Sequence, residues 1–197
     1  MGSVIADQSM SLDGYCTAVG ARGATSLGAW GERLLHAWMF RDDATGRNAA
    51  VRDELFATAG AAIMGRRMFD VGVEPWGEEP PFHMPVFVIT HHAREPLARR
   101  GGTTYHFVTG GIDDVLARAR AVAGDRDVVI LGGADTIRQF LVGGLLDELR
   151  IHLVPVVLGG GTRLFDRTGP EPIDLLPTRV VGAPGATHLT FRVLANH

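Results

Sequence analysis

The sequence predicts an α/β/α protein of three layers, with a mostly parallel central sheet and an antiparallel pair of strands at the C-terminal end. Short apolar runs rich in β-branched residues alternate along the chain with amphipathic helical patterns. Runs such as residues 128–131 are apolar at every position, which indicates parallel strands that helices cover on both faces. With 197 residues, of which 46% are hydrophobic and 21% charged, we expect one domain, residues 1–197.

Each element follows from its local pattern. Apolar, β-branched runs predict strands over residues 4–8, 61–64, 85–90, 104–108, 128–131 and 149–158. Apolar positions at helical spacing predict helices over residues 48–59, 112–123 and 134–142. Near the C-terminal end, residues 179–181 and 188–194 are predicted to pair in antiparallel fashion around residues 182–185. Residues 20–30, 71–84 and 165–178 are long irregular stretches, and we expect at least one of them to border a functional site.

The composition excludes several classes of protein. All 19 basic Lys+Arg residues are arginine, so the chain has no amine for a Schiff base and no P-loop lysine. The net charge is −3 and the arginines are scattered, so we expect no nucleic-acid partner. Cys16 is the single cysteine, which excludes an internal disulfide and a thiolate-rich metal site. Without a signal pattern or a long apolar run, we expect a cytoplasmic protein that does not bind membranes.

The 26 glycines are a second compositional anomaly, beside the absence of lysine. One of them, Gly65, ends an apolar run that opens into a short helical segment. A strand-to-helix turn of this kind presents free backbone N–H groups and a positive dipole end to an anion. Arg66 and Arg67 add guanidinium groups that suit phosphate oxygens. The alternative is a tight turn with solvated arginines.

Gly132 and Gly133 form a second strand-to-helix turn, followed by Ala134, Asp135 and Thr136. Paired glycines let phosphates approach the backbone closely, and the Thr136 hydroxyl lies near the predicted helix start. Tight packing between helix and strand is the alternative. The chain contains no G-x-G-x-x-G pattern, which disfavours the Rossmann mode of dinucleotide binding.

A third candidate contact follows the predicted strand 85–90, where Thr90 is succeeded by His91, His92 and Arg94. Ligands of open α/β sheets bind beyond the carboxyl ends of strands, so Thr90 and Arg94 are placed to hold a further phosphate. No acid stands near the two histidines at metal-ligand spacing, and we therefore expect no metal site.

Three consecutive glycines, residues 159–161, follow the longest predicted strand. Such a loop passes close to another group, which is either a substrate or a second subunit. The sequence alone leaves both possibilities open.

Together these motifs resemble those of the dihydrofolate-reductase-like superfamily. The chain looks like a stand-alone relative of the reductase domain of the bifunctional riboflavin-biosynthesis deaminase-reductase. The resemblance extends over nearly the whole chain, and it depends on four motifs in order: Ser11-Leu12-Asp13-Gly14, Met64-Gly65-Arg66, Leu131-Gly132-Gly133 and the Pro155, Leu158, Gly159, Gly161, Leu164, Phe165 set.

The resemblance implies a three-layer reductase that uses NADPH. It places Gly65, Arg66 and Arg67, together with Thr90, His91 and Arg94, near the adenosine phosphates. It places Gly132, Gly133, Ala134, Asp135 and Thr136 along the pyrophosphate. An arginine-rich adenosine side without an acid for the ribose 2′-hydroxyl also favours NADPH over NADH.

Two departures from the family narrow the expected substrate. Dihydrofolate reductases carry an acid on the helix before the Met-Gly-Arg turn, whereas this chain has Asn48-Ala49-Ala50 there, with Asp53 a turn further on. A folate substrate is therefore disfavoured. With one cysteine the chain lacks the zinc deaminase signature, so deamination is excluded. Reduction of a pyrimidine-type compound, similar to the pathway's ribosylamino-pyrimidine, is the expectation that remains.

Hydride transfer needs a group that protonates or polarises the acceptor. Asp13 is the first candidate, in a turn that faces the cleft in the family, although Asp-Gly is also a favoured turn pair. Asp43 and Asp53 are further candidates. Asp13, Trp38, Gly159 and Phe165 are the expected substrate contacts.

We expect a small-molecule substrate and a homodimer, because homodimers are common among soluble oligomers and frequent in this family. Two alternatives stay open. One is a non-catalytic dimeric module that binds a nucleotide, and the other is a reductase of a different small substrate, such as a pterin, a folate or a carbonyl compound.

Overall fold

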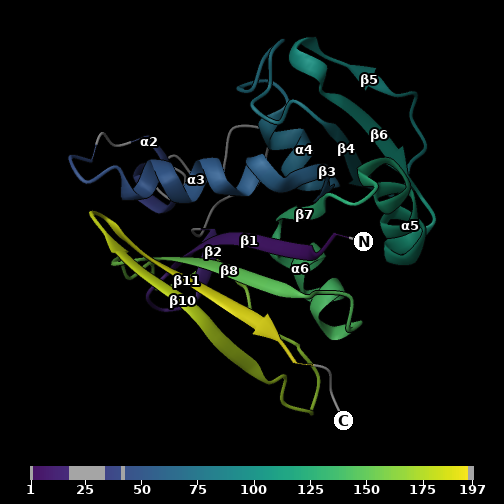
Figure 1. The fold of residues 1–197 in the computed structure, drawn as a ribbon. Coiled ribbons are helices and arrows are strands. Elements are labelled where there is room, and N and C mark those ends of the chain that lie inside the picture. The colour runs from purple at the N-terminus through teal and green to yellow at the C-terminus, as the bar shows by residue number, and fades with distance from the viewer. Residues whose placement is uncertain (1, 18–33, 41–42, 195–197) are drawn as a thin grey trace.

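The computed structural model describes residues 2–17, 34–40 and 43–194 of the chain. Within these residues, nine strands form one sheet in the order β10-β11-β8-β1-β7-β3-β4-β6-β5 (Figure 1). The strand β1 (Val4–Ser11) lies near the middle and pairs in parallel with β7 (Asp127–Gly132) and with β8 (Glu148–Val154). The predicted fold class, an α/β/α protein with a mostly parallel sheet, is confirmed.

On the β7 side the sheet continues with parallel strands, and its edge is antiparallel. The parallel strands are β3 (Ala59–Gly65), β4 (Pro85–Ile89) and β6 (Thr104–Val108). The short edge strand β5 (Leu97–Ala98) pairs with β6 in antiparallel fashion. A 3-10 turn, η1 (Arg100–Gly102), connects the last two. On the β8 side, β11 (Ala186–Val193) and β10 (Leu175–Ala183) form the predicted antiparallel pair.

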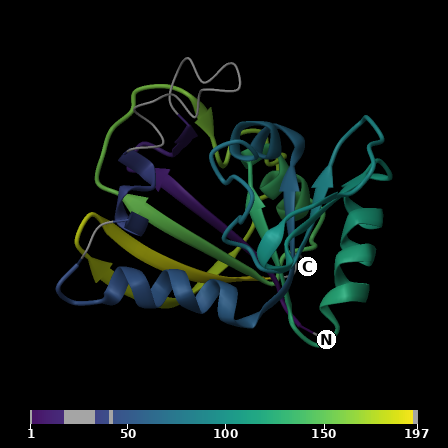
Figure 2. The same ribbon diagram turned by 90° about the horizontal axis from the view of Figure 1, so that it is seen from above.

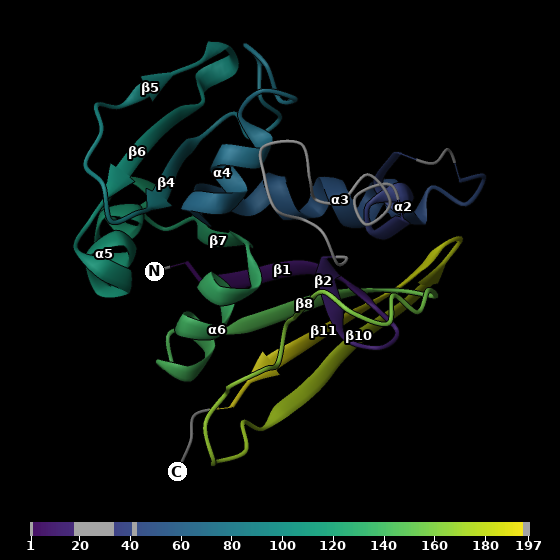
Figure 3. The ribbon, with the colours of Figure 1, turned by 180° about the vertical axis from the view of Figure 1, so that it is seen from behind.

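Helices lie on both faces of the sheet. They are α2 (Ala37–Phe40), α3 (Arg47–Thr58), α4 (Arg66–Gly72), α5 (Gly111–Ala123) and α6 (Ala134–Val142). Figure 2 shows α3 running along one side of the strands, and Figure 3 shows α6 beside β1 and β8 from behind. No helix in the described ranges is both long and apolar enough to cross a lipid bilayer.

The alternation of side chains along the strands produces two separate cores. Val4, Ala6 and Ile130 belong to a cluster with the apolar faces of α5 and α6. Val129 and Met64 belong to a second cluster that packs under α3 and α4. Because successive strand residues point to opposite faces, both faces of the central strands are buried, as the continuous apolar runs predict.

Several predicted boundaries differ from the structure: β1 and β3 are longer than the predicted strands 4–8 and 61–64, and β10 begins at Leu175, inside the predicted irregular stretch 165–178. The strand predicted over residues 149–158 ends at Val154, because Pro155 has no N–H and the chain turns there, with Val156 N–H donating to Val154 O at 2.8 Å. The sequence patterns also missed α2, β5 and the two-stranded ladder of β2 (Tyr15–Thr17) and β9 (Thr162–Arg163). These pieces are too short to show a period. The predicted irregular stretch 20–30 lies outside the described residues.

Candidate functional site

The two glycine turns predicted from the sequence lie side by side. Gly65 ends β3 and Gly132 ends β7, and these neighbouring parallel strands pair Met64 with Gly132. A Cβ on Gly65 would lie 2.6 Å from Thr136 Oγ1 and 3.7 Å from the backbone nitrogen of Gly133. The sheet therefore brings the starts of α4 and α6 into contact, and Gly65 is required by this close approach.

The second turn keeps an open surface. Gly132 is buried with a φ of +116°, a conformation that favours glycine, and the peptide bond between Gly132 and Gly133 is cis. Gly133, by contrast, is exposed, and a Cβ built on it has no atom within 4 Å. It precedes the nine-residue helix α6, whose first N–H groups have no partner within the helix. An anion can therefore approach the backbone at Gly133 without steric hindrance.

The residues that follow Gly133 differ in accessibility. Ala134 and Thr136 are buried against the turn, whereas Asp135 is exposed and forms an ion pair with Arg138 on the same helix. This pairing offsets the repulsion that the Asp135 carboxylate exerts on an anion at the start of α6.

The predicted arginines lie at the same edge of the sheet. Arg66 pairs with Asp70 one turn along α4, at 2.7 Å, and Arg67 is exposed. The Arg94 guanidinium lies over the rings of Phe69 and Phe107, 5.6 Å and 5.0 Å from their centroids. These rings belong to α4 and β6, so they hold Arg94 beside the Gly65 turn.

Thr90 and the histidines after it form the turn that follows β4. The Thr90 N–H donates to Val108 O at 3.0 Å, and the Thr90 hydroxyl accepts the N–H of His92 at 3.1 Å. Thr90 is buried, whereas His91 and His92 are exposed.

Asp13 is held by hydrogen bonds from both sides of its turn. Its carboxylate accepts the Ser11 hydroxyl at 2.7 Å and the backbone N–H groups of Leu158 and Gly159 at 3.1 and 2.8 Å. The Ser11 hydroxyl, together with these N–H groups, lowers the pKa of Asp13 to about 2. Asp13 is therefore a carboxylate at neutral pH, which fixes the glycine-rich loop 159–161 against β1.

Of the other two acids predicted as catalytic candidates, Asp43 lies in the turn before α3 and Asp53 lies on α3. Asp43 accepts the Thr45 hydroxyl at 2.5 Å and the Asn48 N–H at 2.8 Å, and these bonds lower its pKa to about 2. Asp53 is exposed and pairs with its neighbour Arg52 at 2.9 Å. The contacts of Asp43 and Asp53 are thus local, within α3 or the turn before it.

Trp38 and Phe165, the predicted aromatic substrate contacts, have different environments. Trp38 is only 2% exposed, and its Nε1–H donates to Ser9 Oγ at 3.0 Å. Its ring lies 4.4 Å from the ring of His152 and 4.8 Å from that of His188. Phe165 is 44% exposed and follows β9. Phe165 is accessible to a ligand, whereas Trp38 covers a buried polar cluster.

The sequence analysis missed that cluster, which we call the histidine chain: Asp7, His152, His188 and Asn48. Asp7 Oδ2 lies 2.9 Å from His152 Nε2, the two Nδ1 atoms of the histidines are 2.8 Å apart, and His188 Nε2 lies 3.0 Å from Asn48 Oδ1. The sequence carries only a weak indication of this cluster, namely a polar residue on the same face in each of three strands: Asp7 in β1, His152 in β8 and His188 in β11. Only the register, which pairs Ser9 with His152 and His152 with His188, brings these side chains together.

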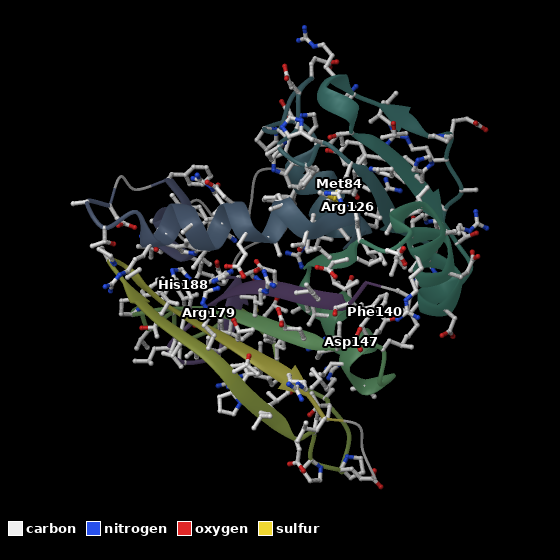
Figure 4. The ribbon with its side chains drawn as sticks, viewed as in Figure 1. Met84, Arg126, Phe140, Asp147, Arg179 and His188 are labelled. Carbon is white, nitrogen blue, oxygen red and sulfur yellow. The ribbon has the colours of Figure 1, made fainter. Side chains whose placement is uncertain are left out.

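The histidine chain has the electrostatics of a buried site. Burial, and then the neighbouring His152, lower the pKa of His188 to about 4, so His188 is neutral at pH 7. Figure 4 labels His188 and Arg179 on the C-terminal strand pair beneath α3. The donor atoms of the chain face one another rather than a common centre, and no group of three or more metal-ligating residues is found in the described part of the protein.

Comparison with known proteins identifies the family. A family model described as the RibD C-terminal domain matches residues 3–183. The uncharacterized protein YyaP of Bacillus subtilis (strain 168) is 28% identical over 109 residues, which are 52% of this chain and 57% of YyaP. The chain thus matches little more than half the length of that curated relative.

Two solved structures show the same fold. One, from Shewanella sp. PV-4, carries a provisional riboflavin-biosynthesis name; its TM-score is 0.71 at 24% identity, over 98% of this chain and 99% of that one. The other is the dihydrofolate reductase of Enterococcus faecalis, with a TM-score of 0.55 at 14% identity, over 98% and 96%. The chain therefore belongs to the RibD C-terminal domain family, a reductase-like family with the dihydrofolate-reductase-like fold.

Proposed function

We propose that the protein is an NADPH-dependent reductase that transfers a hydride to a small heteroaromatic, pyrimidine-type acceptor. The observation that carries this proposal is the open Gly133 surface beside the Gly65 turn. A Cβ on Gly133 would meet no atom within 4 Å, so a pyrophosphate fits against the backbone at the start of α6. When bound there, NADPH supplies the hydride.

The positive charge around the predicted adenosine side favours NADPH over NADH. Arg66, Arg67 and Arg94 lie around the predicted adenosine side, and the stacked Arg94 guanidinium is held in place by two rings. A 2′-phosphate adds two negative charges and several hydrogen-bond acceptors, which guanidinium groups bind in bidentate fashion.

The pyrimidine-type acceptor is proposed from the family and from the strand ends. Membership of the RibD C-terminal domain family supports a substrate similar to 5-amino-6-(5-phosphoribosylamino)uracil. Phe165 follows β9 and is exposed, so it offers an aromatic contact to such a ring. Gly159 follows β8 and is held by the Asp13 carboxylate, which follows β1, and these two residues offer a polar contact.

Calorimetry of the purified protein with each dinucleotide tests the cofactor. We expect NADPH to bind more tightly than NADH by at least about tenfold, equivalent to about 1.4 kcal/mol. If NADPH does not bind, or if the two cofactors bind equally, the proposal is wrong.

Gly133→Asp tests the location of the cofactor. The variant is expected to fold, because Gly133 has a φ of −73° and open space for a side chain, and to lose NADPH binding because its carboxylate repels the pyrophosphate. Gly133→Ala is the matched control, which adds a Cβ without charge and should retain binding. Equal loss in both variants would assign the effect to shape rather than to charge.

A non-catalytic, nucleotide-binding module is the second candidate. It is favoured by the pKa values of about 2 for Asp13 and Asp43, which leave both as carboxylates without a proton to give. A screen of pyrimidine, pterin, folate, quinone and carbonyl acceptors distinguishes the candidates. NADPH oxidation with a pyrimidine supports our proposal, oxidation with another acceptor redefines the substrate, and firm NADPH binding without any oxidation supports the module.

A further inference from the structure

The histidine chain has a fixed orientation at its inner end. Asn48 Nδ2 donates to the carbonyl oxygen of Pro184 at 3.1 Å, and a carbonyl oxygen can only accept a hydrogen bond. The Asn48 amide is thereby oriented with Oδ1 toward His188. His188 Nε2 must consequently carry a hydrogen, which fixes the tautomer of the ring.

The hydrogen bonds of the histidine chain require one proton more than two neutral imidazole rings and a carboxylate provide. Three contacts join Asp7, His152, His188 and Asn48, and each needs one hydrogen between its two heavy atoms. Two neutral imidazoles supply one hydrogen each. The third hydrogen is therefore an additional proton. Its positive charge balances the negative charge of the Asp7 carboxylate, so the histidine chain is neutral overall, as burial requires.

Two arrangements of this proton satisfy all three contacts. In one, Asp7 is a carboxylate and His152 carries hydrogens on both ring nitrogens. In the other, Asp7 is protonated and donates to Nε2 of a neutral His152, whose Nδ1–H still donates to His188. A proton can therefore move between His152 and Asp7 without breaking a hydrogen bond elsewhere in the chain.

The charged groups around the chain are mostly paired with one another. On β8, Arg150 pairs with Glu148 at 2.6 Å, and Arg179 of β10 pairs with Glu54 of α3 at 2.6 Å. Asp43, in the turn before α3, acts on His188 through its charge and is itself held by local hydrogen bonds. Asp7 is thus the carboxylate that directly contacts the histidine rings.

Asp7 is the more accessible end of the histidine chain. The Asp7 side chain is 15% exposed, whereas that of His152 is 3% exposed. Asp7 directly follows Ala6, which pairs with Ile130 of β7, so the backbone of Asp7 lies next to the last residues of β7. The accessible Asp7 carboxyl therefore belongs to the part of β1 that lies beside the end of β7, and it points to the face of the sheet that carries His152.

We propose that Asp7, His152 and His188 form a one-proton reservoir that protonates the acceptor, through Asp7, as the acceptor receives its hydride. This role rests on the proposed reductase function. The hydride brings two electrons to a carbon of the acceptor. The single stored proton passes from His152 Nε2 to Asp7 and from Asp7 to the adjoining nitrogen or oxygen of the acceptor, which leaves the contact between Asp7 and His152 without a hydrogen. One proton from water then restores the chain. A cavity of about 20 Å³ that His152 and His188 both line has room for such a water.

Nuclear magnetic resonance of the ¹⁵N-labelled protein without cofactor tests the reservoir directly. At neutral pH we expect one hydrogen-bonded proton for each of the three contacts, including one shared between the two Nδ1 atoms. His188→Phe, which keeps a ring of similar size, should leave only the proton between Asp7 and His152. A wild-type protein with a proton in only two of the contacts would overturn the proposal.

Kinetics test the role in turnover. Asp7→Asn should lower kcat by about 10²- to 10⁴-fold, the usual contribution of a general acid, with unchanged affinity for NADPH. Wild-type kcat should fall toward alkaline pH as the reservoir loses its proton. His188→Phe removes the acceptor at His152 Nδ1 and should move this fall to lower pH, whereas Asn48→Asp adds a carboxylate and should move it to higher pH.

Thr187→Val is the matched control, because Thr187 precedes His188 on β11, faces the opposite side of the sheet and is not part of the histidine chain. It should leave the pH profile unchanged, and urea unfolding should show that each variant is folded. If Asp7→Asn keeps wild-type kcat, or if His188→Phe and Asn48→Asp shift the profile in the same direction, the reservoir does not supply the proton. Such a result would leave the proposed reductase function intact. A protein that never oxidises NADPH would instead contradict the reductase function. In that case the number of hydrogen-bonded protons seen by nuclear magnetic resonance still decides whether the histidine chain stores a proton.

Discussion

At the scale of single residues, close packing explains the glycine at the end of β3. Gly65 has an ordinary extended conformation, with a φ of −75°, so it is not required for its backbone freedom. It is required because the start of α6 lies against it, with Thr136 Oγ1 only 2.6 Å from the position of a Cβ. The proposed phosphate site thus depends on the absence of a side chain at Gly65 and on the small side chain of Thr136, which lies against it.

Gly65→Ala is expected to destabilise the protein by about 1–3 kcal/mol, the usual cost of an additional methyl group in a filled space. Thr136→Ala should restore most of this loss in the double variant, because it removes the colliding oxygen. Urea unfolding of the two single variants and the double variant measures the coupling. Strictly additive effects would show that the two residues do not collide.

Asp13 gives the protein a predictable sensitivity to acid. Its pKa is about 2 in the folded state, below the ordinary value of 3.8, so its contribution to stability is complete above pH 4 and is lost as the pH falls toward 2. Asp13→Asn should therefore be less stable than wild type at pH 7, and the difference should narrow as the pH falls through this range. Denaturant unfolding at a series of pH values measures it, and a constant difference would contradict the prediction.

At the scale of elements, α6 depends on its buried face. Phe140 is fully buried in the cluster beneath α6, and Figure 4 labels it there, whereas Val142 on the same helix is 51% exposed. Phe140→Ala should cost about 3–5 kcal/mol, and the control Val142→Ala should change stability by about 0.5 kcal/mol or less. Thermal unfolding followed by circular dichroism checks both, and similar losses in the two variants would mean that α6 is packed differently.

Elements also show how far the sequence predicts the site. The two glycine turns were predictable because each follows an apolar run, and the carboxyl ends of parallel strands lie at one edge of a sheet. The histidine chain was not, because His152 and His188 meet only through the register of β8 and β11. A shift of that register by one residue would turn every side chain of β11 to the opposite face, and periodicity within a strand does not specify its partner.

At the scale of the whole molecule, one half of the sheet has an incompletely covered face. Helices α5 and α6 make most of their sheet contacts with β3, β4, β6 and β7. On the same side, the C-terminal half of the sheet carries partly buried apolar side chains, namely Leu153, Leu175, Leu189, Phe191 and Val193. We propose that a second copy of the chain covers this face in a two-fold homodimer.

Light scattering should give a mass near twice 21.1 kDa for the wild type. Phe191→Arg, which places a charge on this face, should give the mass of one chain, whereas Leu176→Arg, on the opposite face of the same strand pair, should stay dimeric. A wild-type mass of one chain would contradict the homodimer.

The central position of β1 also has a consequence for how the chain folds. Both partners of β1 come late in the sequence: Ser3 bonds to Asp127, 124 residues away, and Val4 bonds to Asp147, 143 residues away. Contacts of such high sequence separation close last and slow the folding of a domain. During synthesis, β1 must therefore wait beside an incomplete sheet until β8 has left the ribosome, and Asp7 and His152 cannot meet before then.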